Sequence, residues 1–244
     1  MACSGCRNMN IIGSYEKHPY LSFNNKDIEY LIIGSFPPIR LTNKFICNDS
    51  LGELYEDYPR TFDEEEDLKF YYGSRDNLFW KLISEISGKE LTNIIQITNF
   101  LTENKIGITD LYEHCSRKII NDRINSNDNN LVILKRRELS DIFEKCSSLH
   151  TLIFTSKWVN QRFEEYYSIL SEYSIIILES PSKSYSRFIG RLPAYQGQRL
   201  NNPNYNTYMY RLEKYGEELS FIVCNEMKRV HNKKRIINEH LPNP

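Results

Sequence analysis

Short polar and basic residues gather in Ser180 to Arg187 (SPSKSYSR), where serines, a lysine and an arginine lie within eight residues. Hydroxyl side chains and free amides can bind successive phosphates, and a neighbouring aromatic ring can enter a base stack. Arg187 to Arg191 and Tyr195 to Arg199 again interleave basic and aromatic residues, which suits single-stranded or distorted duplex nucleic acid. A flexible surface loop of ordinary polar residues explains the same pattern.

Two other segments combine residues that suit a ligand site. Gly34 to Arg40 (GSFPPIR) follows an apolar run, and Gly34 allows the main chain to turn tightly beside a ligand. Phe70 to Trp80 (FYYGSRDNLFW) places aromatic residues, a glycine and an amide before a helix. Asp76 or Asn77 could simply cap that helix. Adjacent Tyr71 and Tyr72 alternate in direction, so we expect at least one of them near the surface.

Apolar runs rich in β-branched residues predict the elements that position these segments. The four runs are Tyr30 to Gly34, Ile106 to Leu111, Thr151 to Thr155 and Ser174 to Leu178. Helical periodicity covers Asp76 to Ser87, Lys135 to Cys146, Lys157 to Ser171 and Asn206 to Leu219. We therefore predict an α/β three-layer sandwich, with a central, mostly parallel four-stranded sheet flanked by helices. Its site should lie in the loops after the strands, including Tyr112 to Lys118.

The composition indicates an ordinary globular protein. The 244 residues include 31 Lys and Arg against 32 Asp and Glu, so the net charge of -1 gives no global argument for a polyanionic partner. We predict a single domain over residues 1–244, with an N-terminal extension at 1–25 and a basic C-terminal tail at 226–244. No apolar run reaches the length of a membrane span, and no secretory signal is present, so we expect a cytoplasmic protein.

Three further features have open interpretations. Cys3 and Cys6 form a C-x-x-C that could hold a metal, but no second pair accompanies them, and a mobile tail explains them as well. Glu53 to Asp67 is acidic and is expected to be an exposed insertion. Lys228 to Lys234 could touch phosphates or form a solvated helix end.

Taken in order, the motifs resemble the uracil-DNA glycosylase superfamily, nearest to its mismatch-specific uracil/thymine and hypoxanthine branches. The resemblance extends from about Tyr30 to Arg187. Its four matches are Gly34 to Pro38 (a Gly-Ser-Phe-Pro loop), Tyr72 to Trp80 (ending in Asn-x-Phe-Trp), Gly107 to Leu111 (a Gly-Ile-Thr-x-Leu strand) and Ser180 to Ser182 (a Ser-Pro-Ser loop). Each match is short, and the specificity of the resemblance lies in the order and spacing of the four matches along the chain.

The resemblance implies a monofunctional DNA glycosylase without metal or other cofactor. Such an enzyme flips a deaminated or otherwise modified base out of the helix and hydrolyses its N-glycosidic bond, leaving an abasic site. The leaving base gains negative charge while the sugar becomes cationic, so fixed donors, an oriented water and phosphate contacts are needed. The implied partner is DNA, as a single strand or a mismatched or damaged duplex, and the protein is expected to be a monomer without membrane contact.

The same resemblance assigns roles residue by residue. Tyr72 takes the position of the aromatic that stacks on the flipped base, and Gly34, Ser35, Phe36 and Pro37 would line the base pocket. The DNA-binding residues would be Ser180, Pro181, Ser182, Lys183, Ser184, Tyr185 and Arg187, with Phe188 as a further residue that could enter the helix.

The catalytic group is the main departure from the family pattern. In the mismatch-specific branch an asparagine orients the attacking water, and this chain has Phe36 in that place, which cannot do so. Asn77 is then the first catalytic candidate, with helix capping as its other interpretation, and Ser35 and Asp110 are further candidates. Asp128 is held in reserve, and His114 could stabilise an anionic base or be an ordinary surface residue.

Two other classes of function stay open. The first is a catalytically weak or inactive protein of the same fold that binds DNA or another partner, and Phe36 supports it. The second is an α/β enzyme acting on free nucleosides or nucleotides, although the chain has no P-loop or dinucleotide glycine pattern. Glu179, next to the serine loop, would repel phosphate unless it turned away or paired with Lys183, so activity on ordinary uracil is in doubt.

Overall fold

Four parallel strands form the central sheet, in the order β3-β2-β8-β9. The computed structural model describes residues 16–42, 63, 65–120, 123–124, 128–167 and 169–222. The strands are β2 (Tyr30–Gly34), β3 (Ile106–Asp110), β8 (Thr151–Phe154) and β9 (Ser174–Ile177). All three neighbouring pairs are parallel. The four predicted strands are confirmed, three of them ending one residue earlier than expected.

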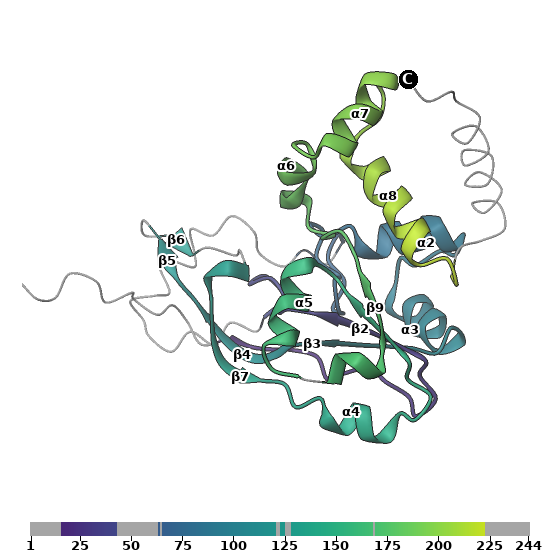
Figure 1. Ribbon diagram of the computed structural model, residues 1–244. Coiled ribbons are helices and arrows are strands. Elements are labelled where there is room, and N and C mark those ends of the chain that lie inside the picture. Colours follow the sequence, from purple (N-terminus) through teal and green to yellow (C-terminus); the bar gives the residue numbers. More distant parts are fainter. Residues whose placement is uncertain are drawn as a thin grey trace, which may run out of the picture.

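Helices cover both faces of this sheet, which confirms the predicted three-layer arrangement (Figure 1). Alternation along β2 shows the division, since Ile32 lies in one hydrophobic cluster while Leu31 and Ile33 lie in the other. The helices whose residues share the cluster of Ile32 are α2 (Phe79–Ser87), α3 (Ile94–Glu103) and α8 (Thr207–Glu218). The opposite face is covered by α4 (Ser140–Lys145) and α5 (Lys157–Glu164).

A second, antiparallel sheet lies beside the first and was not predicted. Its strands, in the order β1-β4-β7, are β1 (Glu16–Lys17), β4 (Tyr112–Arg117) and β7 (Leu131–Arg136). The hairpin β5 (Ile119–Ile120) and β6 (Arg123–Ile124) extends from it. The expected loop at Tyr112 to Lys118 is therefore wrong, because this segment pairs with β1 and β7.

The predicted helices needed three corrections. Lys135 and Arg136 end strand β7, so the helix expected from Lys135 begins only at Ser140. The helix expected from Lys157 ends at Glu164, and a separate 3-10 turn, η2 (Ile169–Glu172), follows. α2 begins at Phe79 because the residues expected to start it are bonded to another loop, as described below. Helix α3 was missed, since its sequence IIQIT is rich in β-branched residues.

The last described part of the chain adds a helical unit outside the sheet. We call residues 183–206 the helical arm; it contains η3 (Lys183–Tyr185), α6 (Ser186–Ile189) and α7 (Pro193–Asn201). Figure 1 shows α6 and α7 beyond the sheet, adjoining α8. Among the described residues, no helix is long and apolar enough to cross a membrane.

Residues 16–25 belong to the folded body, whereas the sequence analysis placed them in an extension. Glu16 and Lys17 pair with β4, and Phe23 forms a bridge with Ile108 of β3. Cys3, Cys6, most of Glu53 to Asp67, and the tail 226–244 lie outside the described residues. Asp67 itself is buried and accepts hydrogen bonds from the Arg75 amide and the Arg40 guanidinium, whereas Glu65 and Glu66 beside it are exposed, as expected.

Candidate active site

The candidate site forms where β2 and β3 end. Gly34 is the last residue of β2 and Asp110 the last of β3, and the sheet register places them side by side. Carboxyl ends of parallel strands share one edge of a sheet, which is the usual position of ligand sites in α/β folds. The Gly-Ser-Phe-Pro loop and the Gly-Ile-Thr-Asp strand thus meet as the sequence analysis expected.

Asp110 is a buried carboxylate held by two donors. Its side chain is only 4% exposed. The Tyr72 hydroxyl donates to Oδ1 over 3.2 Å, and His18 Nε2 lies 2.8 Å from Oδ2. The Tyr20 amide donates to His18 Nδ1 over 3.1 Å, so Nδ1 carries no proton. His18 is therefore the Nε2–H tautomer and donates to Asp110, because one ring nitrogen of a neutral histidine accepts while the other donates.

Gly34 is required at this position because a side chain would not fit. A Cβ atom on Gly34 would collide with the Tyr72 hydroxyl and with Asp110 Oδ1. The absence of a side chain lets the hydroxyl and carboxylate come together against the end of β2.

Tyr72 occupies a costly backbone conformation. Its φ of 55° lies in the left-handed region, which is rare for an aromatic residue and occurs where surrounding structure enforces it. The Tyr72 ring contacts Phe79 with centroids 4.7 Å apart, and the residue as a whole is half-buried. Burial, and then the charge of Asp110, raise the pKa of Tyr72 well above its usual value, so the hydroxyl stays protonated and acts as a donor. Tyr72 thus has a fixed hydroxyl end, and the residue as a whole keeps some exposure.

Ser35 and Asp128 form a second polar pair beside the first. The Ser35 hydroxyl donates to Asp128 Oδ2 over 2.9 Å. Burial raises the pKa of Asp128 from 3.8 to about 6, although Ser35 and Arg117 lower it, and the nearby charge of Asp110 adds to the rise. Asp128 can therefore gain or lose a proton close to neutral pH.

Arg117 fixes the loop that carries Ser35. It is almost fully buried, and its Nε donates to Glu16 Oε1 over 2.8 Å while Nη2 donates to the Pro37 carbonyl over 2.7 Å. Burial alone would lower the pKa of Arg117, but Glu16 raises it overall. Phe36 is 7% exposed and lies between the His18 ring and the Arg117 guanidinium. The structure therefore places Phe36 behind the loop, where it supports the site rather than lining an open base pocket.

The serine loop, residues 180–186, is bonded to the aromatic segment. The Leu78 amide donates to the Pro181 carbonyl, and the Lys183 amide donates to the Asp76 carbonyl, both over 2.9 Å. Asn77 and Ser182 form an antiparallel bridge between these bonds. The two segments are thus one connected unit.

Arg211 of α8 holds the serine loop from the other side. This buried guanidinium donates to the carbonyls of Ser180 (2.9 Å) and Ser182 (2.8 Å) and to the Ser186 hydroxyl (3.2 Å). Burial lowers the pKa of Arg211. Glu179 lies near the Tyr185 hydroxyl and contributes to raising the pKa of Tyr185, which burial raises most. The Glu179 carboxylate therefore interacts with Tyr185 rather than with Lys183.

Asn77 lies just before Leu78, the N-cap residue of α2, and its side chain forms a local turn bond rather than a helix cap. Its Oδ1 accepts a hydrogen bond from the Phe79 amide over 2.8 Å, at the start of α2. No hydrogen bond joins Asn77 to Ser35, Tyr72 or Asp110, all of which are described. Asn77 is connected to the serine loop, whereas Asp110, Ser35, Gly34 and Tyr72 lie together.

His18, Arg117 and Arg211 were not among the candidate residues. Their roles depend on partners distant in sequence: His18 and Asp110 are 92 positions apart, and Arg117 and Glu16 are 101 apart. No local spacing indicates such pairs. His114, a weaker candidate, lies on β4 and pairs with Glu113 over 3.2 Å. Within the described ranges, no group of three His, Cys, Asp or Glu side chains could hold a metal ion.

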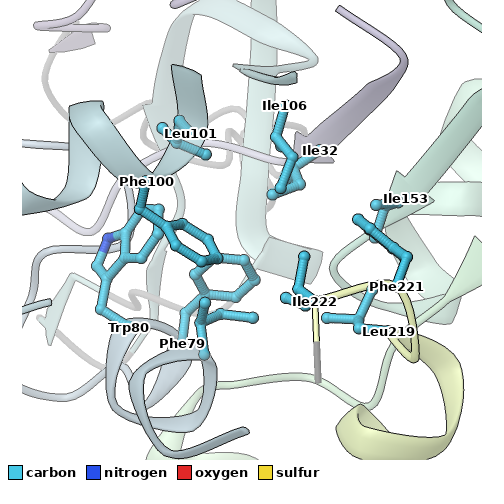
Figure 2. Close-up of a pocket in the computed structure, with 11 residues that line it drawn as sticks. Ile32, Phe79, Trp80, Phe100, Leu101, Ile106, Ile153, Leu219, Phe221 and Ile222 are labelled. Atoms are coloured by element: carbon cyan, nitrogen blue, oxygen red, sulfur yellow. The ribbon is translucent and has the colours of Figure 1, made fainter. Parts of the chain in front are cut away.

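A separate cavity lies in the hydrophobic core and is not part of the site (Figure 2). It is bounded by the sheet, α2, α3 and the residues around the end of α8. Its lining residues are Ile32, Phe79, Trp80, Ile83, Phe100, Leu101, Ile106, Ile153, Leu219, Phe221 and Ile222. The single polar side-chain atom among them, Trp80 Nε1, already donates to the Tyr71 carbonyl. The cavity therefore offers no group that could orient a polar ligand.

Comparisons with known proteins return a structural likeness alone. No protein-family model and no curated protein matches the chain. Among solved structures, the chain is similar to a solution NMR structure of a "putative uracil DNA glycosylase" from Methanosarcina acetivorans, with 21% sequence identity and a TM-score of 0.47. The match covers 71% of this chain and 89% of the other.

Proposed function

We propose that the protein is a monofunctional DNA glycosylase that flips a deaminated or otherwise modified base and hydrolyses its N-glycosidic bond. The observation that carries the proposal is the Asp110 carboxylate, which His18 and the half-buried residue Tyr72 hold as donors at the strand ends. The motif order that resembles uracil-DNA glycosylases supports the same conclusion. The substrate would be DNA, with no cofactor, and the protein would act as a monomer.

In this proposal Asp110 is the group that acts on water. A carboxylate has about four acceptor positions, and Tyr72 and His18 use two of them, so capacity remains to accept a proton from water. Water adds to C1′ of the sugar as the bond to the base breaks, and the base leaves with the bonding electrons. The negative charge of Asp110 also stabilises the cationic sugar that develops.

The remaining residues bind and position the DNA. The ring of Tyr72 would stack on the flipped base, with Gly34, Ser35 and Pro37 at the pocket wall and Phe36 behind it. The DNA-binding residues of the serine loop would hold the backbone through hydroxyls, amides and Lys183. The partners of Asp110 and Ser35 are a histidine, a tyrosine and a carboxylate, with no lysine among them, which supports simple hydrolysis over covalent strand cleavage.

A catalytically weak DNA-binding protein is the second candidate. Two observations favour it: Phe36 is buried where the mismatch-specific branch has the water-orienting asparagine, and the side-chain oxygen of Asn77 already accepts a hydrogen bond from the Phe79 amide. Such a protein would bind DNA through the serine loop, and substitution of Lys183 by Glu would abolish that binding.

The test is base release from labelled oligonucleotides. Single- and double-stranded DNA carrying uracil, hypoxanthine, xanthine or a modified cytosine is incubated with the protein and then treated with alkali, which cleaves at abasic sites. We expect Asp110→Asn to lower the rate by about 10²- to 10⁴-fold, the usual contribution of a general base. Asn77→Ala should leave the rate within a few-fold while lowering stability by about 1 kcal/mol, the typical net contribution of one hydrogen bond.

Asp141→Asn is the matched control, since Asp141 is an exposed carboxylate on α4 paired with Lys145. Wild-type activity in Asp110→Asn, with lost activity in Asn77→Ala, would reject Asp110 and restore Asn77 as the catalytic residue. The absence of cleavage on every substrate, with salt-sensitive DNA binding retained, would favour the binding protein.

A further inference from the structure

Positive charge is segregated in one part of this nearly neutral chain. The 33 residues from Ser180 to Leu212 contain no Asp or Glu. Their five basic residues are Lys183, Arg187, Arg191, Arg199 and Arg211. The rest of the chain has 26 Lys and Arg against all 32 Asp and Glu. Such segregation indicates a surface for a negatively charged partner.

Three of these cations lie in one row. Lys183, Arg187 and Arg191 are spaced by four residues along η3, α6 and the following turn, and Gly190 keeps helical backbone angles (φ −56°, ψ −16°). Residues four apart lie toward the same side of an α-helix, so this spacing places the three cations toward one side of the segment. The 3-10 turns at the two ends of the segment rotate the outer two cations. All three residues are exposed. At about 1.5 Å per residue the row spans about 12 Å, which matches three to four steps of one DNA strand.

The row is not neutralised by the described part of the chain. No described carboxylate lies within ion-pair distance of Lys183, Arg187, Arg191 or Arg199, whereas Arg75, Lys105 and Arg162 elsewhere all have such partners. Exposed amides accompany Arg199 on α7, namely Gln196, Gln198 and Asn201. Amide side chains also bind phosphate oxygens, so the same surface carries charged and neutral donors.

The arm presents these groups on an ordered scaffold. Ile189, Tyr195, Tyr205 and Tyr210 form its own small hydrophobic core, which joins α6 and α7 to α8. Arg211 fixes the start of the arm through the serine-loop carbonyls. Phe188 is 52% exposed next to Tyr185, with ring centroids 4.9 Å apart. A charged row on packed helices loses less conformational entropy on binding than the same residues on a loop would.

We propose that the helical arm is a second contact surface for the DNA backbone, on which Arg191 and Arg199 extend the contacts that Lys183 and Arg187 begin. The strand would leave the site at the serine loop and follow the row outward along α6 and α7 (Figure 1). The inference rests on the proposed function for the identity of its ligand, DNA, but it requires no catalysis.

The experiment measures binding to an unmodified labelled oligonucleotide over a range of salt concentrations. Each phosphate contact contributes a slope of about −0.9 to a plot of log affinity against log salt for duplex DNA. Arg191→Gln combined with Arg199→Gln should therefore make the slope less negative by about 1.8 and weaken binding at low salt. Lys26→Gln combined with Lys89→Gln is the matched control, with the same change in net charge at exposed lysines outside the arm.

An unchanged slope in the arm variant, or an equal change in the control, would overturn the inference. Affinity for an acidic protein that depends on Arg191 and Arg199, without such dependence for DNA, would do so as well. A wild-type protein without glycosylase activity, whose salt slope changes as expected in the arm variant, would support DNA binding by the arm and contradict the glycosylase proposal. An active protein whose slope is insensitive to the arm would contradict the arm alone.

Discussion

Two buried arginines hold the two loops of the candidate site, and they differ in what balances their charge. Arg117, behind the Gly-Ser-Phe-Pro loop, is paired with the buried carboxylate of Glu16 at 2.8 Å. Arg211, behind the serine loop, donates to two main-chain carbonyls and one hydroxyl, and within the described residues it forms no ion pair. The pKa values of the two side chains differ accordingly, raised for Arg117 and lowered for Arg211.

The two loops thus differ in whether a carboxylate pairs with the arginine that holds them. The Glu16–Arg117 pair connects β1, β4 and the Pro37 carbonyl, so its charges are neutralised inside the protein and its effect is positional. The charge of Arg211 is directed at the serine loop without a paired carboxylate. Burial lowers the pKa of Arg211, and the charge of Glu179 acts in the opposite direction without overcoming this effect. Each of the following substitutions tests one part of this contrast.

Arg117→Met should have the largest effect. The substitution leaves Glu16 buried without its cation and removes the donor to the Pro37 carbonyl, so we expect a loss of about 3–5 kcal/mol in the free energy of unfolding. Urea denaturation followed by circular dichroism measures it. Adding Glu16→Gln should recover a large part of the loss, because the buried charge is then removed. A loss below about 1 kcal/mol would show that the pair is not structural.

Arg211→Met should be less costly. It leaves two carbonyls without a donor but no buried charge without a partner. Because Ser180 and Ser182 are partly exposed, we take the lower part of the range of about 1–3 kcal/mol for each unsatisfied group and expect a loss of about 2–3 kcal/mol in total. The same denaturation experiment measures it. The salt dependence of DNA binding should also weaken, because the serine loop loses its fixed shape. A loss as large as that of Arg117→Met would contradict the contrast between the two arginines.

The strands of the central sheet could be predicted because buried parallel strands are continuous apolar runs, as in Tyr30–Gly34. The edge of the sheet that carries the candidate site could be predicted as well, because motif residues that directly follow parallel strands lie together at that edge. β4 and β1 could not be predicted, because they bury an ion pair and so lack the apolar alternation of a half-buried strand. Arg117, Arg211 and His18 were missed for a related reason: each acts on a loop far away in sequence, and a single sequence does not show which distant residues meet.

The pH dependence of stability tests the contact between Asp128 and Ser35 of the Gly-Ser-Phe-Pro loop. The Asp128 pKa of about 6 lies above the ordinary value of 3.8, so the folded state binds this proton more tightly than the unfolded state does. Stability is therefore lost as pH rises from about 4 to about 6, by about 2 kcal/mol once partial exposure is considered. Asp128→Asn should remove this part of the decline and make the protein relatively more stable at pH 7.

Unfolding free energies of the wild type and Asp128→Asn, measured from pH 4 to 7, provide the comparison. Asp141→Asn is the control, because that carboxylate is exposed. If the stability curves of wild type and Asp128→Asn run parallel over this range, the carboxyl group of Asp128 is not the one that titrates near pH 6.

Substitution of His18 has the smallest expected effect and tests one specific point. It asks whether His18 orients the Asp110 carboxylate, rather than changing its charge. In the proposed mechanism His18 is a positioning residue, whose Nε2–H holds Asp110 while the Tyr20 amide fixes its tautomer. His18→Phe fills the space between Phe36 and Tyr71 but removes the hydrogen-bond donor to Asp110. We therefore expect kcat to fall by about tenfold, equivalent to about 1.4 kcal/mol, while KM is unchanged. His18→Gln offers an N–H in place of Nε2 and should restore most of the rate. Full activity in His18→Phe, with a loss in His18→Gln, would mean that His18 acts only by packing, whereas rescue by glutamine alone would show that its hydrogen bond orients the carboxylate.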